Sequence, residues 1–274
     1  MKHKINFIAE IGINHNGDIN IAKQLIDCAK LTGCDFVKFQ KRDPDISVPQ
    51  NKKKDKVNTP WGKMNYIDYK KKIEFDLSDY EQLDEYCRQK QIGWFVSCWD
   101  IPSAKTMCKI NTMTKIPSAK LNDKKLCKFV DQNFKFKILS TGMSTQKQID
   151  SAIKNLNPQV VMHTVSTYPC PIEELNLSYI KFLSKKFPKI QIGYSGHEYG
   201  LSTTFAAVGM GATWIERHIT LDRHMWGSDQ LSSVEPAGLF QLISGIRAIE
   251  RSFGKAEPRK IKKSEIEKLK SLRG

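Results

Sequence analysis

Two histidines occupy matching positions after two apolar segments of this sequence. His197 follows the run 190–194 and His218 follows the run 212–215, with one glycine-rich helical stretch, 201–211, between the runs. If the runs are neighbouring parallel strands, both imidazoles emerge at the same end of the sheet, close enough to share one divalent metal ion. A lone histidine at a strand end is usually a hydrogen-bonded structural group, but two on adjacent strands favour a metal site.

Polar side chains end the other apolar runs in the same way. They are Glu10, Lys38, Gln40, Ser97, Lys115, Ser118, Ser140, Ser166, Tyr168, Ser195 and Glu216. Two lysines, several hydroxyls and nearby backbone amides are what a phosphate, or a phosphate with a carboxylate, needs for binding. The combination predicts a metal-assisted enzyme that acts on a phosphorylated or strongly anionic small molecule.

Several of these residues have a second explanation. Lys38 and Lys115 lie within apolar runs, where an unpaired ammonium is costly, so ligand binding competes with a buried ion pair to Glu10 or Glu216. Asp229, in a Gly-Ser-Asp sequence, also fits a simple turn. The loop segment 14–17, which contains a histidine, fits a loop and helix-cap role equally well.

The order of the apolar runs predicts the fold that gathers these side chains. Eight strands are expected at 5–12, 35–40, 93–98, 113–117, 137–140, 160–164, 191–194 and 213–216, and helices at 19–32, 78–91, 145–155 and 236–253. Eight alternating units favour an α/β fold, a (β/α)₈ TIM barrel in a single domain over residues 1–254. Asp18, Ser78 and the pair 144–145 are the expected helix caps.

One long segment, 41–76, interrupts this alternation. It follows the second strand, so it must lie at the C-terminal end of the strands, where barrel loops form active sites. A lid and a purely structural excursion are both consistent with its composition. Residues 255–274 form a basic tail.

Composition narrows the class of protein. The chain has 274 residues and a formal charge of +15, but its lysine runs lack interleaved aromatics, which argues against nucleic acid as a partner. No apolar stretch is long enough to cross a membrane, and the start of the chain has no cleavable signal pattern. The seven scattered cysteines form no disulfide framework, and only Cys98, at a strand end, could touch a ligand. We expect a soluble cytoplasmic protein.

Seven stretches of the chain resemble the N-acetylneuraminate (sialic acid) synthase family, which includes legionaminate and pseudaminate synthases. They are FIAEIGINHNGD (7–18), DFVKFQ (35–40), KIPSAKL (115–121), ILSTGMST (138–145), STYPCP (166–171), GYSGHEYG (193–200) and WIERHITLDRHMWGSDQ (214–230). Together they run in order from about residue 5 to 250, and as a set they are highly specific.

The resemblance implies a barrel enzyme that condenses phosphoenolpyruvate with the open-chain aldehyde of an N-acetylated amino sugar, such as N-acetylmannosamine. The products are a nine-carbon 2-keto sugar acid and phosphate. It also implies a divalent metal ion held by His197 and His218, Mn²⁺ by preference with Mg²⁺ or Co²⁺ as alternatives. The metal would act as a Lewis acid on the aldehyde.

Roles for the remaining residues come from the same resemblance. Glu10 would be catalytic, facing the reacting centre. Lys38, Lys115, Ser118, Ser140 and Ser195 would bind phosphoenolpyruvate, with Ser97 nearby and Ser166 at the same strand ends. Gln40, Tyr168 and Asp229 match positions that contact the sugar. A homodimer is possible.

The chain departs from the family pattern in three places. Many members carry Ser-Asp-His where this chain has Ser195-Gly196-His197, which removes a carboxylate next to a metal ligand. Many also carry Ser-Thr-Pro-Phe-Asp where this chain has Ser-Cys-Trp-Asp at 97–100. Full-length relatives continue into a small antifreeze-like C-terminal domain, for which the tail after residue 254 is too short a substitute.

Two other functions compete with the synthase. One is a phosphoenolpyruvate-dependent synthase of 3-deoxy sugar acids that acts on a phosphorylated aldose. The other is a non-catalytic barrel that binds a sugar or an anionic polymer. The histidine pair and the absence of an obvious second phosphate site favour the sialic-acid-type synthase over the first. Retention of both histidines, both lysines and Glu10 counts against the second.

Overall fold

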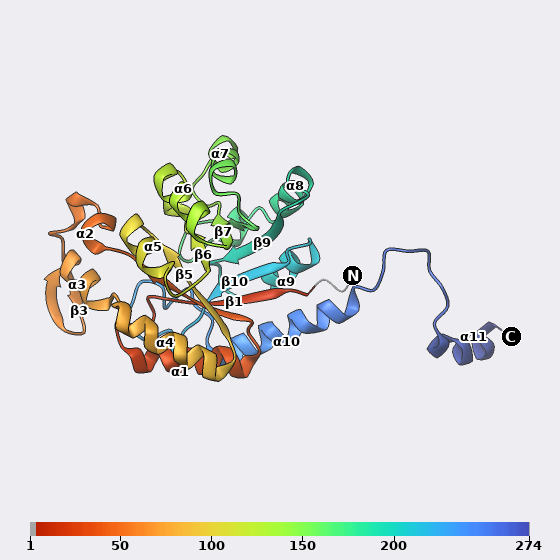
Figure 1. Cartoon of the computed structure of the whole chain (residues 1–274). Coiled ribbons are helices and arrows are strands. Elements are labelled where there is room, and N and C mark those ends of the chain that lie inside the picture. Colours follow the sequence, from red (N-terminus) through yellow and green to blue (C-terminus); the bar gives the residue numbers. More distant parts are fainter. Residues whose placement is uncertain (1–3, 274) are drawn as a thin grey trace.

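Eight parallel strands close into a barrel in the computed structural model, which describes residues 4–273. Around the barrel the order is β1-β10-β9-β8-β7-β6-β5-β2, so each strand pairs with its neighbours in the sequence of barrel strands (Figure 1). The strands are β1 (Asn6–Gly12), β2 (Phe36–Lys41), β5 (Gly93–Cys98), β6 (Met113–Ile116), β7 (Phe136–Ser140), β8 (Val160–Thr164), β9 (Gln191–Gly196) and β10 (Trp214–His218). The predicted (β/α)₈ barrel is confirmed, and the strand boundaries differ from the predicted ones by at most two residues.

Helices cover the outside of the barrel. They are α1 (Ile19–Thr32), α4 (Leu77–Lys90), α5 (Ile101–Met107), α6 (Lys124–Asn133), α7 (Gln146–Leu156), α8 (Tyr179–Lys186), α9 (Ser202–Gly209) and α10 (Pro236–Ser252). Asp18 and Thr145 cap α1 and α7 as expected. The cap predicted at Ser78 is wrong: the carboxylate of Asp76 accepts the Asp79 amide at 3.0 Å and starts α4 earlier.

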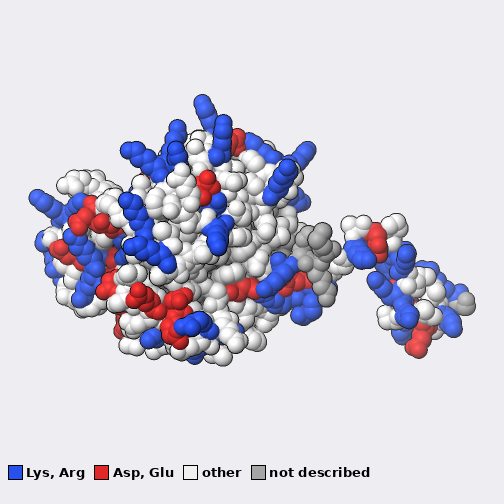
Figure 2. All heavy atoms as spheres, in the orientation of Figure 1, with Lys and Arg blue, Asp and Glu red and all other residues white. Residues whose placement is uncertain are grey.

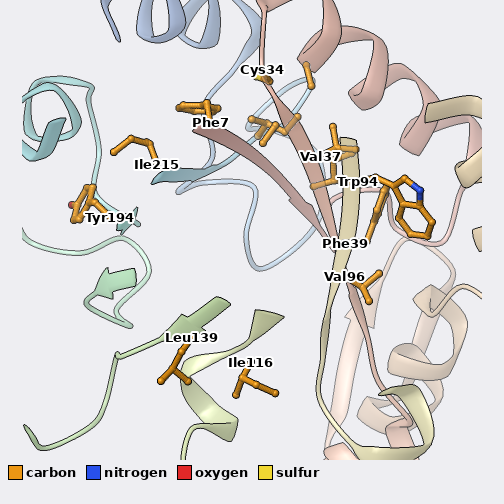
Figure 3. Close-up of a cluster of buried hydrophobic side chains, with 14 of the residues drawn as sticks. Phe7, Cys34, Val37, Phe39, Trp94, Val96, Ile116, Leu139, Tyr194 and Ile215 are labelled. Carbon is orange, nitrogen blue, oxygen red and sulfur yellow. The ribbon is translucent and has the colours of Figure 1, made fainter. Parts of the chain in front are cut away.

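The core has two layers because successive side chains of each strand point to opposite faces. Residues that face the helices, including Phe7, Val37, Phe39 and Trp94, form the larger layer (Figure 3). Alternate residues point into the barrel, where Ile8, Phe95, Ile138, Val160, Met162 and Trp214 form a separate apolar cluster. Further along each strand the inward residues become polar, and those positions form the site.

The segment after β2 forms a small ordered unit. It contains α2 (Pro44–Ser47), η1 (Gln50–Lys52), the antiparallel hairpin β3 (Lys56–Thr59) and β4 (Gly62–Asn65), and α3 (Tyr66–Ile73). Tyr69 and Ile73 of α3 pack with Ile13, which follows β1, and with Trp226, which follows β10. The segment therefore lies at the C-terminal end of the strands, as predicted.

The basic tail continues past α10 into η4 (Lys263–Glu265) and α11 (Ile266–Arg273), which lie apart from the barrel in Figure 1. On the face shown in Figure 2, lysine and arginine side chains are scattered around much of the surface, and acidic side chains gather mainly at the left and lower part of the barrel. Among residues 4–273, no helix combines the length and the apolar character needed to cross a membrane.

Candidate active site

One cavity at the C-terminal ends of the strands gathers the predicted residues. Its lining includes Glu10, Lys38, Gln40, Ser97, Lys115, Ser118, Ser140, Ser166, Tyr168, Ser195, His197, Glu216 and His218. They meet because inward-facing positions recur every two residues along a strand, so the polar residues at the strand ends, and those in the loops that follow, gather at one mouth of the barrel. Of the predicted site residues, Asp229 is the one outside this lining.

Lys38 forms the centre of one polar group. Its ammonium lies 2.7 Å from Oε2 of Glu10 and donates a hydrogen bond of 2.9 Å to Ser97 Oγ. Gln40 donates from Nε2 to the other Glu10 oxygen at 2.9 Å. Both charged side chains are almost fully buried. A buried ion pair is therefore present, and it forms part of the cavity wall.

Lys115 forms the second group with Glu216. Its ammonium lies 2.7 Å from Glu216 Oε1, which also accepts the Ser195 hydroxyl at 3.1 Å. Burial lowers the pKa of Lys115, although Glu216 opposes the shift. Burial alone would raise the pKa of Glu216, but the two ammonium groups at Lys115 and Lys38 outweigh it and lower that pKa. The cavity thus contains two lysines and two carboxylates, already arranged as ion pairs.

The two histidines face each other next to Tyr168. Their ring centroids are 5.5 Å apart, and the Tyr168 ring lies 4.1 Å from that of His197. His197 Nδ1 is 2.8 Å from the Val165 carbonyl, which places its proton on Nδ1 and leaves Nε2 as a lone-pair donor. Burial is the main reason that the pKa of His197 is lowered to about 3. The ring is therefore neutral at physiological pH.

His218 has an unusual environment on its Nδ1 side. This nitrogen is buried and has no hydrogen-bond partner within residues 4–273. The nearest carboxylate is Asp229, whose Oδ2 lies 3.8 Å away. Asp229 belongs to the loop after β10, and its own backbone carbonyl accepts the Ser232 and Ser233 hydroxyls. It therefore combines the predicted turn role with a position beside the histidine pair.

Serine hydroxyls form another part of the cavity lining. Ser118 Oγ accepts the Gly142 amide at 3.0 Å, just after β7. A Cβ at Gly142 would lie 2.2 Å from Ser166 Oγ and 2.8 Å from Ser118 Oγ. Glycine at this position leaves space for both hydroxyls, of which Ser118 accepts the backbone amide. Together with Ser140, they provide neutral donors near the lysines.

A buried carboxylate, Glu198, follows His197 in the chain. Glu198 accepts hydrogen bonds from Tyr194 at 2.8 Å and Thr203 at 2.6 Å, and its Oε1 lies 3.3 Å from Arg217 Nη1. A Cβ at Gly196 would lie only 2.5 Å from Glu198 Oε2. The Asp of the common Ser-Asp-His pattern would therefore clash here, and Glu198 supplies a carboxylate on the same loop instead.

The sequence predictions missed some of the lining and misplaced one residue. The missed residues are Trp99, Pro117, Ala119, Met143 and Thr164. Thr164 ends β8, so the strand-end argument could have found it. Cys98 was a candidate ligand contact, but its sulfur accepts the Thr114 hydroxyl at 3.4 Å in the layer that faces the helices. The prediction for Cys98 is wrong because residue 98 has the opposite strand parity to Ser97.

His15 has a structural role. Its ring stacks on Phe75 with centroids 4.0 Å apart, and its Nδ1 accepts the Gly17 amide at 3.0 Å. Burial, assisted by the positive charge of Arg42, lowers its pKa to about 3. The loop role is thus the one observed.

Comparisons with known proteins agree with this geometry. A model of the NeuB family matches residues 25–258. The chain belongs to the NeuB family.

Among NeuB relatives, N-acetylneuraminate-9-phosphate synthase of Mus musculus is 36% identical over 260 residues, which is 92% of this chain and 72% of the relative. N,N'-diacetyllegionaminic acid synthase of Campylobacter jejuni is 34% identical over 98% of this chain and 83% of its own length. The crystal structure of a sialic acid synthetase from Leptospira borgpetersenii superposes with a TM-score of 0.87 at 30% identity, covering 99% of this chain and 93% of that one. The protein is an enzyme of this sialic-acid-type synthase family.

Proposed function

We propose that the enzyme condenses phosphoenolpyruvate with the open-chain aldehyde of an N-acetylated amino sugar, N-acetylmannosamine or a related sugar. The products are a nine-carbon 2-keto sugar acid and inorganic phosphate. Relatives named for sialic, legionaminic and pseudaminic acids support this class of reaction. The observation that carries the proposal is the meeting of two lysine–carboxylate pairs with two histidines in one cavity.

The histidine pair fits a divalent metal ion. His197 Nδ1 is engaged by a backbone carbonyl, which is the usual partner of the ring nitrogen opposite a metal, and His218 has a buried nitrogen without a partner among the described residues. Within residues 4–273 there is no group of three or more His, Cys, Asp or Glu side chains arranged for a metal. Two protein ligands would leave positions for water and substrate oxygens. A bound Mn²⁺, or Mg²⁺ or Co²⁺ in its place, would supply Lewis-acid polarisation of the sugar aldehyde.

The lysines and serines suit phosphoenolpyruvate. Lys38 and Lys115 provide two buried cations, and Ser118, Ser140 and Ser195 provide hydroxyl donors around them. Because each lysine already has a carboxylate partner, the site is preorganised and the ligand's negative charge adds to an existing ion-pair network. These groups would hold the phosphate and carboxylate while C3 of phosphoenolpyruvate forms a carbon–carbon bond with the aldehyde carbon.

Glu10 would act on the other side of the reacting carbons. Its carboxylate faces the cavity between Lys38 and Gln40, where it can bind a sugar hydroxyl or accept a proton from water. Water adds to C2 of the oxocarbenium-like intermediate, and the tetrahedral adduct releases phosphate by cleavage of the C2–O bond. Gln40, Tyr168 and Asp229 would contact the sugar.

The experiment is a turnover assay on the full chain. Purified protein is incubated with Mn²⁺, phosphoenolpyruvate and each of several N-acetylated hexosamines, and phosphate release is followed together with product mass. We expect a keto acid with one sugar type, and its loss on chelation and in His197→Ala. Phosphoenolpyruvate binding without product across the whole panel would refute the proposal.

A further inference from the structure

Gln40 lies between two groups of opposite charge. Its Nε2 donates to Glu10 Oε1 at 2.9 Å, and its Oε1 accepts a hydrogen bond from the guanidinium of Arg42. A guanidinium can only donate and an ionised carboxylate can only accept, so one orientation of the amide satisfies both neighbours. The reverse orientation would put the amide oxygen against Glu10 and the amide nitrogen against Arg42. Arg42 therefore determines which end of the Gln40 amide faces the carboxylate.

Arg42 reaches Gln40 from outside the cavity. It follows β2 directly, and because side chains alternate along an extended chain, residues 40 and 42 lie on the same side. Arg42 is only 8% exposed, and its guanidinium carbon lies 4.8 Å from the centroid of the Trp99 ring. It thus contacts two residues of the cavity lining, Gln40 and Trp99, without belonging to the lining itself.

Glu74 holds Arg42 in place. It follows α3, and its Oε1 lies 2.6 Å from Arg42 Nε. Its other carboxylate oxygen accepts the Arg42 backbone amide at 3.2 Å. Both side chains are almost fully buried, and two contacts to one carboxylate restrict the geometry of the arginine more than a single exposed ion pair would. Through Arg42, the long segment after β2 therefore supports the amide that contacts Glu10.

The neighbouring cation, Lys41, has a different environment. Its ammonium donates to the Phe75 carbonyl at 2.6 Å and lies 5.9 Å from the centroid of the Tyr80 ring, which belongs to the layer between strands and helices. The Tyr80 hydroxyl donates to the backbone carbonyl of Gln40 at 3.0 Å. The backbone of Gln40 is thus held separately from its side chain. Removal of the Arg42 side chain should release the Gln40 amide and leave the end of β2 in place.

We propose that Arg42 is a positioning residue for the sugar: it fixes the Gln40 amide with its nitrogen toward Glu10 and the cavity. One N–H of this nitrogen donates to Glu10, and the second, which has no protein partner within residues 4–273, donates to an acceptor oxygen of the sugar. The inference rests on the proposed function, because Gln40 acts on the sugar only if the sugar occupies this cavity.

The test is a double-mutant cycle on the full-length enzyme. The wild type, Arg42→Met, Gln40→Ala and the double variant are assayed with Mn²⁺, phosphoenolpyruvate and the amino sugar that the turnover assay identifies. We expect Arg42→Met to lower kcat/KM for the sugar by at least about tenfold, as is typical when a hydrogen bond to a charged group is lost. In the Gln40→Ala background the same substitution should change kcat/KM by less than about threefold, because the amide that Arg42 positions is already absent.

Two controls distinguish positioning from a general effect on the fold. Lys41→Met removes the same charge from the adjacent residue and should match the wild type. Arg42→Met leaves Glu74 buried without its partner, so the cycle is repeated in a Glu74→Gln background, which removes the orphaned charge. An equal fall in kcat/KM on Arg42→Met with and without the Gln40 side chain would overturn the inference.

Proton exchange of the Gln40 side-chain amide separates this inference from the proposed function. In protein labelled with ¹⁵N-glutamine, the Gln40 signal is the one absent from Gln40→Ala. We expect exchange of its amide protons with water to be at least about tenfold faster in Arg42→Met than in the wild type or Lys41→Met. If no protein forms product, the proposed function fails, and the positioning of Gln40 by Arg42 stands only if this exchange is faster. Equal exchange in all three proteins would refute it.

Discussion

Lys115 on β6 reaches across the barrel to Glu216 on β10, and their charged atoms lie 2.7 Å apart with each side chain only 4% exposed. The two strands are not neighbours in the barrel. The pair therefore spans the cavity floor, where it supports both the fold and the anion site. Its two roles can be separated by mutation.

Lys115→Met should remove both roles at once. It leaves the Glu216 carboxylate buried with Lys38 at 3.9 Å and the Ser195 hydroxyl, so we expect a loss of about 3–5 kcal/mol in unfolding free energy. Turnover should fall at least about a hundredfold, since a charge-assisted contact to the substrate is lost. Chemical denaturation and the phosphate-release assay measure the two effects.

Adding Glu216→Gln to Lys115→Met should restore most of the stability and none of the activity, because it removes the orphaned charge without restoring the ammonium. Lys137→Met is the control, since Lys137 pairs with Asp131 at 2.7 Å on the helix side of β7, outside the cavity. Full activity in the double variant would contradict an anion-binding role for Lys115.

Glu10→Gln tests the carboxylate that faces the reacting centre. The amide keeps the size of the side chain and can still accept a hydrogen bond from Gln40, and Lys38 keeps Glu216 at 3.9 Å as a counter-charge, so the fold should persist at reduced stability. We expect kcat to fall by about 10²–10⁴ while phosphoenolpyruvate still binds, as is typical when a general acid or base is removed. Steady-state kinetics measure the change in kcat, and calorimetry measures the binding of phosphoenolpyruvate. A variant with unchanged kcat and a weaker KM would assign Glu10 to binding alone.

Gly196→Asp should destabilise the end of β9, next to His197. The new Cβ would meet Glu198 Oε2 at 2.5 Å, and overpacking of this kind costs about 1–3 kcal/mol. Glu198→Thr alone leaves Arg217 buried without its carboxylate and should cost about 3–5 kcal/mol. The double variant should recover part of both losses, because the aspartate introduced by Gly196→Asp then has space and supplies a carboxylate. Strictly additive losses in a double-mutant cycle would contradict this exchange.

His15 should make stability depend on pH. Its pKa is about 3 in the folded protein and 6.5 in an unfolded chain, so in this window the unfolded state binds a proton that the folded state does not. The free energy of unfolding therefore falls as the pH falls, by up to about 1.4 kcal/mol per pH unit for this one group. In His15→Asn, whose side-chain oxygen can still accept the Gly17 amide, the slope between about pH 6 and 5 should be shallower by roughly that amount. Equal slopes in urea titrations would show that burial of His15 does not contribute.

The site residues at the strand ends were predictable because side chains along a strand alternate between its two faces, so every second residue points into the barrel. Lys38 and Gln40, or Glu216 and His218, share one face of a strand, and eight such strands in a barrel leave one place for them to meet. Cys98 shows the limit of this argument. A shift of one residue along a strand moves a side chain from the cavity, where Ser97 lies, to the side that faces the helices. The cap of α4 was missed because Asp and Ser have nearly equal preference for the N-cap position. Which of Asp76 and Ser78 caps the helix depends on the backbone path of the preceding segment, and that path cannot be read from the sequence.

The support of Gln40 by Arg42 and Glu74 could not be predicted from local pattern. Arg42 follows β2 and Glu74 lies 32 positions later, after α3, so their meeting depends on tertiary packing rather than periodicity. Likewise, the role of Glu198 depends on the space left by Gly196, which the spacing of residues does not reveal.

The most direct test of the account follows the bridging oxygen of phosphoenolpyruvate. The enzyme is given phosphoenolpyruvate labelled with ¹⁸O between C2 and phosphorus, Mn²⁺ and the amino sugar, and the released phosphate is examined by mass spectrometry alongside the keto acid. The account predicts labelled phosphate in equal amount to a nine-carbon keto acid, because water attacks C2 and the C2–O bond breaks. Unlabelled phosphate, or labelled phosphate without the keto acid, would contradict a synthase in this cavity.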